Sequence, residues 1–314
     1  MRLLGTLAAL VLLLGSPVRA QMAESAGPVR LPEVDSLVAD LASDDPDVSL
    51  AAYRKLPRYG ERAVPSLIEF LAKPDPDRPG ESVRGRIYVL LGKIGSPTEL
   101  VLPALLSGLR DDSSRARQKA ARAFGLVGAP AAVCIPALEE ALQDSVRWVR
   151  LAAATSLGEM GSAGAAAANS LVDLLGDDTD EDLLMSIMSP STAAYGALLA
   201  IGAPAAPALA SGLLSDDELV RARSSILLTE IGPPAIPYLL GTLAAADDSD
   251  TGVLVVATLF RMGAPAADAL RECQAVGDTE VREAASLCLR AIEEPGSVEL
   301  EGLLRAVLGN GQPN

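Results

Sequence analysis

One phrase recurs along the chain and constrains its fold more strongly than any other feature of the 314 residues. The clearest copy runs from Val149 to Gly161 and reads VRLAAATSLGEMG. Other copies begin at Val83, Ala116, Val220 and Val281, and weaker copies end at Gly60, Gly202 and Gly263. Consecutive copies end on glycines that are 30 to 41 residues apart, except the last copy, which lacks the glycine. A period of this size indicates stacked repeats, because a single unit cannot bury its apolar face alone.

Each copy predicts one helix, and a second helix is expected after it. Apolar residues recur at helical spacing and end on a glycine that we expect to adopt the left-handed αL conformation. Five or eight residues later a proline is expected to start the second helix, at Pro65, Pro103, Pro136, Pro207 and Pro237. In two other units this place holds Asn169 or Asp268, which we expect to cap the helix.

The sequence therefore predicts an all-α fold, an α-solenoid of about seven to eight helix pairs over residues 33–294. Each pair consists of helix A, a tight turn and helix B. Residues 295–314 are predicted to form a capping helix and a tail, because Leu300, Leu303, Leu304 and Val307 share one helical face.

The phrase V-R-x-x-A-A-x-x-L-G-x-[IM]-G, preceded by Asp and followed by P-x-L, resembles HEAT repeats. It is most similar to the short HEAT-like class of the phycobilisome lyases. The resemblance covers about residues 35 to 294 and implies a right-handed superhelix that acts as a binding scaffold. It also implies a ladder of Asp and Arg side chains between stacked repeats, here Asp112, Arg117, Asp144, Arg150, Asp216 and Arg221.

Paired acids mark the start of most units, at Asp44-Asp45, Asp111-Asp112, Asp177-Asp178, Asp216-Asp217 and Asp247-Asp248. Their place just before helix A favours helix capping and interaction with the helix dipole over a catalytic role. Because stacking places these acids along one edge, we also expect an acidic ridge there.

Composition excludes several classes of function. The chain has no histidine, which rules out histidine-dependent nucleophilic triads and metal sites that need histidine. HEAT-like relatives include bilin lyase subunits and a di-iron hydroxylase with His-Glu motifs, whose nearest analogues here are Glu159 and Glu230, without the histidine. A net charge of −15 argues against binding nucleic acid. We therefore expect no catalytic residues and no cofactor.

The first twenty residues read as a secretory signal peptide. Arg2 precedes the apolar run from Leu3 to Leu14, and Val18-Arg19-Ala20 places small residues before a cleavage site. An uncleaved N-terminal anchor is the alternative. We expect residues 21–32 to form a flexible lead-in, no further membrane span, and export of a bacterial protein to the periplasm or the extracellular space.

Two features are candidates for partner binding. The longest interval between units contains Leu184, Met185, Ile187 and Met188 outside the repeat register, which indicates either an adaptable binding surface or an elongated core helix. Trp148 is the only tryptophan, and it occupies a slot that is mostly polar in other units. It is either an interface residue or a side chain packed partly against the neighbouring unit.

The same interval has the alternate acid spacing of a calcium loop, at Asp178, Asp180 and Asp182. Leu183 replaces the turn glycine and Ser189 stands where the bidentate glutamate belongs. The pattern therefore favours a solvated acidic loop, with a calcium-modulated binding module as the alternative.

The three cysteines are candidates for a disulfide bond. Cys273 in the helix B of the seventh unit is a candidate disulfide partner for Cys288 in the next helix A, and three buried thiols, Cys134 included, are the alternative.

The sequence as a whole predicts an exported, monomeric scaffold that binds a protein partner through a concave helix-B face. The alternative is an enzyme or an enzyme subunit of the HEAT-like lyase type.

Overall fold

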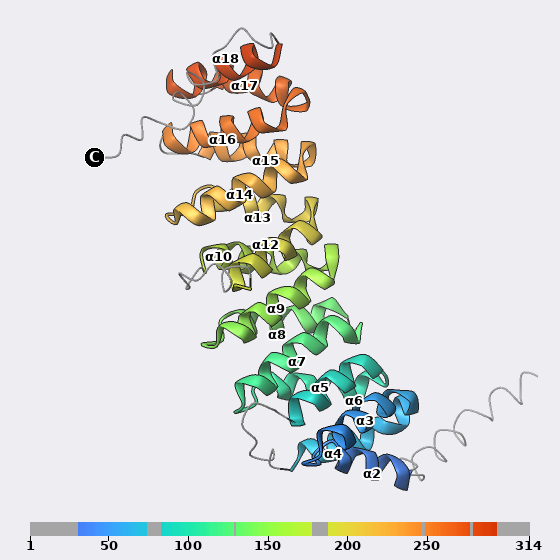
Figure 1. The fold of residues 1–314 in the computed structure, drawn as a ribbon. Helices are drawn as coiled ribbons and strands as arrows, with labels where there is room; N and C mark the ends of the chain where they lie inside the picture. The colour runs from blue at the N-terminus through green and yellow to red at the C-terminus, as the bar shows by residue number, and fades with distance from the viewer. Residues whose placement is uncertain are drawn as a thin grey trace, which may run out of the picture.

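The computed structural model describes residues 31–73, 83–128, 130–177, 188–245, 249–276 and 279–293. Within these residues all regular secondary structure is α-helix or 3-10 helix. Figure 1 shows the helices paired and stacked in one column from the N-terminal to the C-terminal unit. The predicted all-α solenoid is therefore confirmed.

Each repeat contributes one helix to each of two parallel rows. The A helices are α3 (Pro46–Lys55), α5 (Val83–Ile94), α7 (Ser114–Val127), α9 (Arg147–Glu159), α12 (Pro190–Ile201), α14 (Glu218–Ile231), α16 (Ser249–Met262) and α18 (Thr279–Glu293). The B helices are α4 (Val64–Leu71), α6 (Thr98–Gly108), α8 (Ala131–Leu142), α10 (Ala168–Asp173), α13 (Ala206–Gly212), α15 (Ile236–Ala245) and α17 (Ala267–Val276). Helix α2 (Pro32–Asp40) precedes the first pair and packs on α3 and α4. Among the described residues, seven complete pairs are flanked by α2 and α18.

The glycines that end the repeated phrase all have left-handed φ angles. Gly60, Gly95, Gly128, Gly161, Gly202, Gly232 and Gly263 have φ between 54° and 76°, and in the described part of the chain no other residue has a positive φ. Gly128 is a true αL terminator, with φ 63° and ψ 23°. The αL prediction is wrong for Gly60, whose ψ is −134°, and for Gly202, Gly232 and Gly263, whose ψ lies between −140° and −144°. At the last three positions the chain turns directly into the short 3-10 helices η4 (Ala203–Ala205), η5 (Pro233–Ala235) and η6 (Ala264–Ala266).

The proline prediction is right for three units and wrong for two. Pro65, Pro207 and Pro237 lie in the first turn of α4, α13 and α15. In contrast, Pro103 and Pro136 lie inside α6 and α8. The reason is a second proline upstream: Pro97 and Pro130 are the N-cap residues of these helices and start them earlier.

The predicted caps Asn169 and Asp268 are also inside their helices, each as the second residue. A 3-10 helix precedes each one, η2 (Gly161–Ala167) before α10 and η6 before α17. In α10 the N–H of Ala168 donates to the carbonyl of Ala165 in η2. A carbonyl of the preceding turn thus accepts a hydrogen bond from the first N–H group of α10, so no side-chain cap is needed for it.

Small residues let neighbouring A helices approach closely in the N-terminal half. A Cβ at Gly92 of α5 would lie 2.8 Å from the Cβ of Ala123 in α7, and one at Gly158 of α9 would lie 2.8 Å from the Cα of Ala197 in α12. The largest fully buried side chains, Tyr88 and Phe124, belong to α5 and α7. One continuous apolar core thus runs between the two rows of helices.

None of the described helices alone is long and apolar enough to span a membrane. The segments Pro190–Ile201 and Ala203–Gly212 reach that length only together, and they are bent by 115° relative to each other. The predicted signal peptide, most of the lead-in and the predicted capping helix lie outside the described residues.

Candidate interaction surface

An Arg–Asp ladder joins successive units. The guanidinium of Arg117 in α7 binds the carboxylate of Asp144 in the following unit, at 2.7 and 3.1 Å. It also donates to the backbone carbonyls of Asp111 and Asp112 at 3.0 and 3.3 Å. Each such arginine therefore holds the turn before its own helix and the turn before the next helix A.

Two further arginines pair with the aspartate 27 residues later, and Arg150 also repeats the contacts to the carbonyls before its helix. Arg84 lies 2.7 Å from the carboxylate of Asp111, and Arg150 lies 2.7 Å from that of Asp177. The resemblance did not assign Arg84, Asp111 or Asp177 to the ladder. Their signal in the sequence is the constant spacing of 27 residues between arginine and aspartate in all three rungs.

The structure corrects two of the expected ladder residues. Asp112 offers Arg117 its backbone carbonyl, and its carboxylate is exposed. Asp216 is exposed as well, and Arg221 donates to the carbonyl of Ser215 at 2.6 Å. Asp111 and Asp144, each three positions before the next A helix, bind the arginine of the previous unit, because that arginine projects forward along the stack.

The ladder also changes the expectation of an acidic ridge. Asp111, Asp144 and Asp177 are held by arginines, so the edge is neutralised at these positions, while Asp112, Asp216 and Asp217 are exposed. Burial alone would raise the pKa of Asp144, but the hydrogen bonds from Arg117 and the Val146 N–H and the charges of Arg117 and Arg150 lower it overall. Helix capping, as predicted, is seen for Asp45 and Asp217, whose carboxylates accept backbone N–H groups of α3 and α14.

Charge is instead segregated between the two rows of helices. In α2, α4, α6, α8 and α10 there are eight acidic residues and no basic residue: Glu33, Asp35, Asp40, Glu69, Glu99, Glu139, Glu140 and Asp173. In α3, α5, α7 and α9 there are eleven lysines and arginines and only two acids, Asp47 and Glu159. We call the outer side of the B helices, together with α2, the B face. It is acidic over the N-terminal half of the solenoid.

Polar contacts between neighbouring B helices hold this face together. Ser66 of α4 donates to the Asp35 carboxylate of α2 at 2.6 Å, and Ser170 of α10 donates to the Glu139 carboxylate of α8 at 2.9 Å. In each case a serine of one unit binds an acid of the unit before it, 31 residues earlier. Of the other six acids, Asp40 is half-buried and five are exposed: Glu33, Glu69, Glu99, Glu140 and Asp173.

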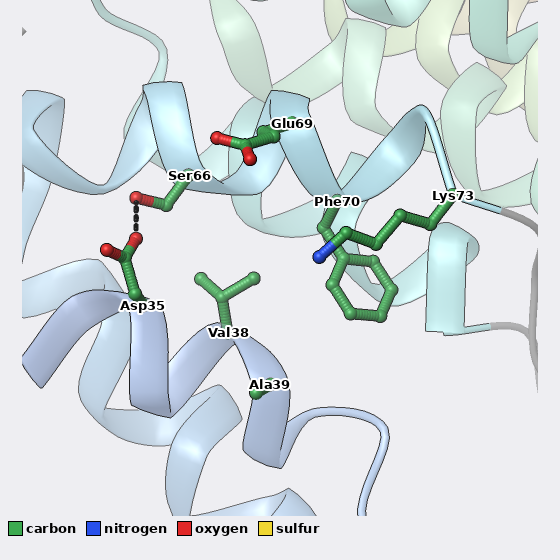
Figure 2. A pocket seen from close by; sticks show the side chains of 7 residues that line it. All are labelled: Asp35, Val38, Ala39, Ser66, Glu69, Phe70 and Lys73. Atoms are coloured by element: carbon green, nitrogen blue, oxygen red, sulfur yellow. Dashed lines mark hydrogen bonds between the residues drawn. The ribbon is translucent and has the colours of Figure 1, made fainter. Parts of the chain in front are cut away.

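The N-terminal end of the B face contains a small cleft between α2 and α4. Figure 2 shows Asp35 and Ser66 on one side, and Lys73 extended over the ring of Phe70 on the other. The Lys73 ammonium lies 5.5 Å from the centre of that ring. The cleft has a volume of about 210 Å³, below the roughly 300–1,000 Å³ typical of small-molecule sites. It therefore fits one side chain of a bound polypeptide better than a cofactor.

Arg147 contacts two of the residues singled out for partner binding, Trp148 and Met188. The Arg147 guanidinium lies 5.0 Å from the centre of the Trp148 ring and donates to the carbonyl of Met188 at 3.2 Å. Trp148 is half-buried, and Met188 is 55 % exposed. The other members of this prediction, Leu184, Met185 and Ile187, lie outside the described residues, as do Asp178, Asp180 and Asp182.

The described residues contain no group of three or more metal-ligating side chains. Glu159, one of the two analogues of a metal-binding glutamate, lies 2.8 Å from Arg122 of the neighbouring A helix. Glu230, the other, accepts a hydrogen bond from Tyr195 at 2.9 Å, and burial together with this carboxylate raises the pKa of Tyr195 to about 12. Each glutamate thus links its own A helix to a neighbouring A helix.

All three cysteines are free thiols with fully buried side chains. The candidate disulfide between Cys273 and Cys288 is therefore not formed in this structure, which has the alternative of three buried thiols. Burial raises the pKa of Cys134, and it raises the pKa of Cys273 to about 11 and that of Cys288 to about 12. Thiols in this state are protonated and unreactive.

Comparison with known proteins identifies the family to which this helical repeat is similar. The family model described as HEAT repeats matches residues 34–114 and 102–189. A search of curated proteins returned no match.

Several solved structures are similar to the chain. Human deoxyhypusine hydroxylase is 19% identical over 88% of this chain and 99% of its own, with a TM-score of 0.35. The CpcE–CpcF complex of phycocyanin lyase from Nostoc sp. PCC7120 is 20% identical over 90% and 95%, with a TM-score of 0.34. Kap121p bound to Pho4p is 15% identical over 87% of this chain and 35% of its own, with a TM-score of 0.45. The two family matches and the stacked A–B pairs together show that the chain is a HEAT-repeat protein.

Proposed function

We propose that this protein is an exported, non-enzymatic scaffold whose B face binds a positively charged segment of a protein partner. The observation that carries the proposal is the segregation of charge: eight acids and no base in helices α2, α4, α6, α8 and α10. Opposite charges across an interface favour encounter and fix the register of the partner. An extended surface of this kind suits an extended polypeptide, and its sign disfavours nucleic acid.

The arrangement of the basic residues supports this assignment. On the A helices, ladder arginines such as Arg117 and Arg150 bind carboxylates and carbonyls of the protein itself. On the B face, Arg110 follows α6 and forms an ion pair with Glu140 at 2.9 Å. Glu69 of α4, Glu99 of α6 and Asp173 of α10 have exposed side chains. The B face thus offers negative charge in a repeating row.

The test compares two triple variants of equal net charge, using as probe a fluorescent peptide of alternating lysine and alanine. The B-face variant is Glu69→Gln/Glu99→Gln/Asp173→Asn, and the control on A helices is Asp47→Asn/Glu218→Gln/Glu283→Gln. We expect the B-face variant to weaken peptide binding by about tenfold at low salt and the control by less than about twofold. Equal losses in the two variants, or binding that salt does not weaken, would contradict the proposal.

A second candidate surface is the edge formed by Trp148 and Met188. The observation that favours it is that Arg147, whose guanidinium lies over the Trp148 ring, donates to the carbonyl of Met188, a residue with an exposed side chain. Such aromatic and methionine side chains are frequent anchors in interfaces. If a partner uses this edge, Trp148→Ala and Met188→Ser each reduce its capture by the full chain, while the B-face variant does not. The reverse pattern assigns binding to the B face.

Export is tested separately from binding. The protein is isolated from each fraction of the cell that makes it, and its N-terminus is sequenced. We expect the extracytoplasmic fraction to hold a chain that begins at Gln21, because Val18-Arg19-Ala20 precedes the cleavage site. A chain that begins at Met1 and stays in the cytoplasm would overturn this part of the proposal and leave the B-face assignment intact.

A further inference from the structure

The last two described helices form an antiparallel hairpin whose register can be read from its contacts. Helices α17 and α18 are joined by residues 277 and 278 only, so they run in opposite directions. Arg271 of α17 binds Glu293 of α18 at 2.5 Å, and Gln274 donates to Ser286 at 2.9 Å. Moving forward along α17 therefore moves the contact backward along α18.

This register places two cysteines at the same level of the hairpin. Cys273 is adjacent to Gln274, and Cys288 lies between Ser286 and Glu293. Both side chains are 0 % exposed, so both lie in the core rather than on the outer surfaces of the two helices. The charge of Cys273 also contributes to the raised pKa of Cys288, an effect that requires the two groups to be near each other.

We propose that Cys273 and Cys288 form a disulfide that ties α18 to the end of the solenoid. The bond goes beyond the binding role of the B face and does not depend on it. Among the described elements α18 packs on α16 and α17, and it can open locally when these contacts are lost, because contacts with neighbouring units set the local stability of a solenoid. A bond across this hairpin closes a short loop and opposes that opening.

The oxidant is a disulfide of the glutathione class, RS–SR. The thiolate of one cysteine attacks a sulfur of the donor, forming a mixed disulfide and releasing one RS⁻. The thiolate of the second cysteine then attacks the protein sulfur of the mixed disulfide and releases the second RS⁻. The two protein thiols give up two electrons and two protons, and the donor becomes two RSH molecules.

Burial decides when this reaction takes place. Thiols in the closed hairpin are protonated and shielded from the donor, so oxidation proceeds during folding or when α18 transiently opens. Cys134 of α8 is also buried, and it lies several units away from the pair, which makes it a matched control.

The test is refolding of the full chain in oxidised glutathione, followed by thiol counting and intact mass. We expect a fall from three free thiols to one, and a mass lower by two hydrogen atoms. Cys134→Ser should still form the bond, and Cys288→Ser should not. Circular dichroism verifies that each variant is folded. In the oxidised protein, amide hydrogen exchange in α18 should slow by about tenfold, and dithiothreitol should reverse the change.

Other results would overturn the proposal. These are three free thiols after oxidative refolding, a bond that contains Cys134, glutathione adducts without a second step, or exchange in α18 that oxidation does not slow.

Discussion

At the scale of single residues, the glycines that end the A helices have a similar φ but two different values of ψ. Gly128 has the αL geometry, with ψ 23°, and Gly232 has ψ −144°. An added Cβ meets no atom within 4 Å at either position. The two sites therefore differ in backbone geometry and not in the space available for a side chain.

This difference predicts unequal responses to asparagine. Asn tolerates αL, so Gly128→Asn should lower the free energy of unfolding by about 1 kcal/mol or less. The geometry at Gly232 is essentially restricted to glycine, so Gly232→Asn should lower it by about 2–3 kcal/mol. Urea denaturation of both variants measures the difference, and equal losses would show that ψ does not matter at these turns.

The ladder aspartate Asp144 and its exposed counterpart Asp112 form a second pair of residues to compare. The carboxylate of Asp144 is 13% exposed and accepts two hydrogen bonds from Arg117. We expect Asp144→Asn to lower the free energy of unfolding by about 2 kcal/mol at neutral pH. Asp112→Asn should change it by less than about 0.5 kcal/mol, because Arg117 uses the Asp112 backbone carbonyl.

The pH dependence of this effect has a defined sign. Because folding lowers the pKa of Asp144, the stability that its ionised form contributes is complete above the ordinary value of 3.8. It is lost as the pH falls from there through the lowered pKa of the folded state. The difference between wild type and Asp144→Asn should therefore shrink over this acidic range. A difference that stays constant would mean that the carboxylate charge is not responsible.

At the scale of helices, the sequence predicted the pairing of A and B and the position of every terminal glycine, because each glycine ends an apolar pattern. It did not predict ψ at these glycines, since ψ depends on whether a 3-10 turn follows. It also placed Pro103 and Pro136 at helix starts, although Pro97 and Pro130 start those helices. Local signals identify an element more reliably than its first residue.

The candidate surface was predictable only in part, and the ladder explains why. An arginine and the aspartate five residues before it are neighbours in sequence, which favoured the pair Asp112 and Arg117. The carboxylate that binds Arg117 belongs to the next unit, so its identity depends on stacking. The acidic B face has the same origin: it emerges when charges are grouped by helix row, which requires the helix boundaries.

Close packing between A helices makes its own prediction. Ala at Gly158 would place its Cβ 2.8 Å from the Cα of Ala197, so α9 and α12 would have to separate. We expect Gly158→Ala to lower the free energy of unfolding by about 1–2 kcal/mol. Gly196→Ala on the facing helix is the control, since its Cβ meets nothing within 4 Å and alanine favours helix. If both variants raised the free energy of unfolding, α9 and α12 would be able to accommodate the added Cβ without loss of stability.

At the scale of the whole molecule, the two halves of the solenoid are joined differently. Arg–Asp rungs at Arg84, Arg117 and Arg150 connect units in the N-terminal half. The corresponding positions in α12 and α16 hold Ser191 and Gly252, which cannot form such a rung. Gly92 in α5 and Gly158 in α9 allow the neighbouring A helix to approach closely. In α12 and α16 the same position holds Leu199 and Phe260.

Both differences weaken contacts between neighbouring units of the C-terminal half, and the stability of a solenoid is set mainly by such contacts. We therefore predict that amide hydrogens of α14 and α16 exchange faster than those of α5, α7 and α9, by about tenfold or more. Hydrogen exchange with mass spectrometry under native conditions measures this directly. The ladder contribution is isolated by Arg117→Met, which should raise exchange in α7 and α9 while leaving α14 and α16 unchanged. Uniform protection along the wild-type solenoid would mean that rungs and close glycine contacts do not set its local stability.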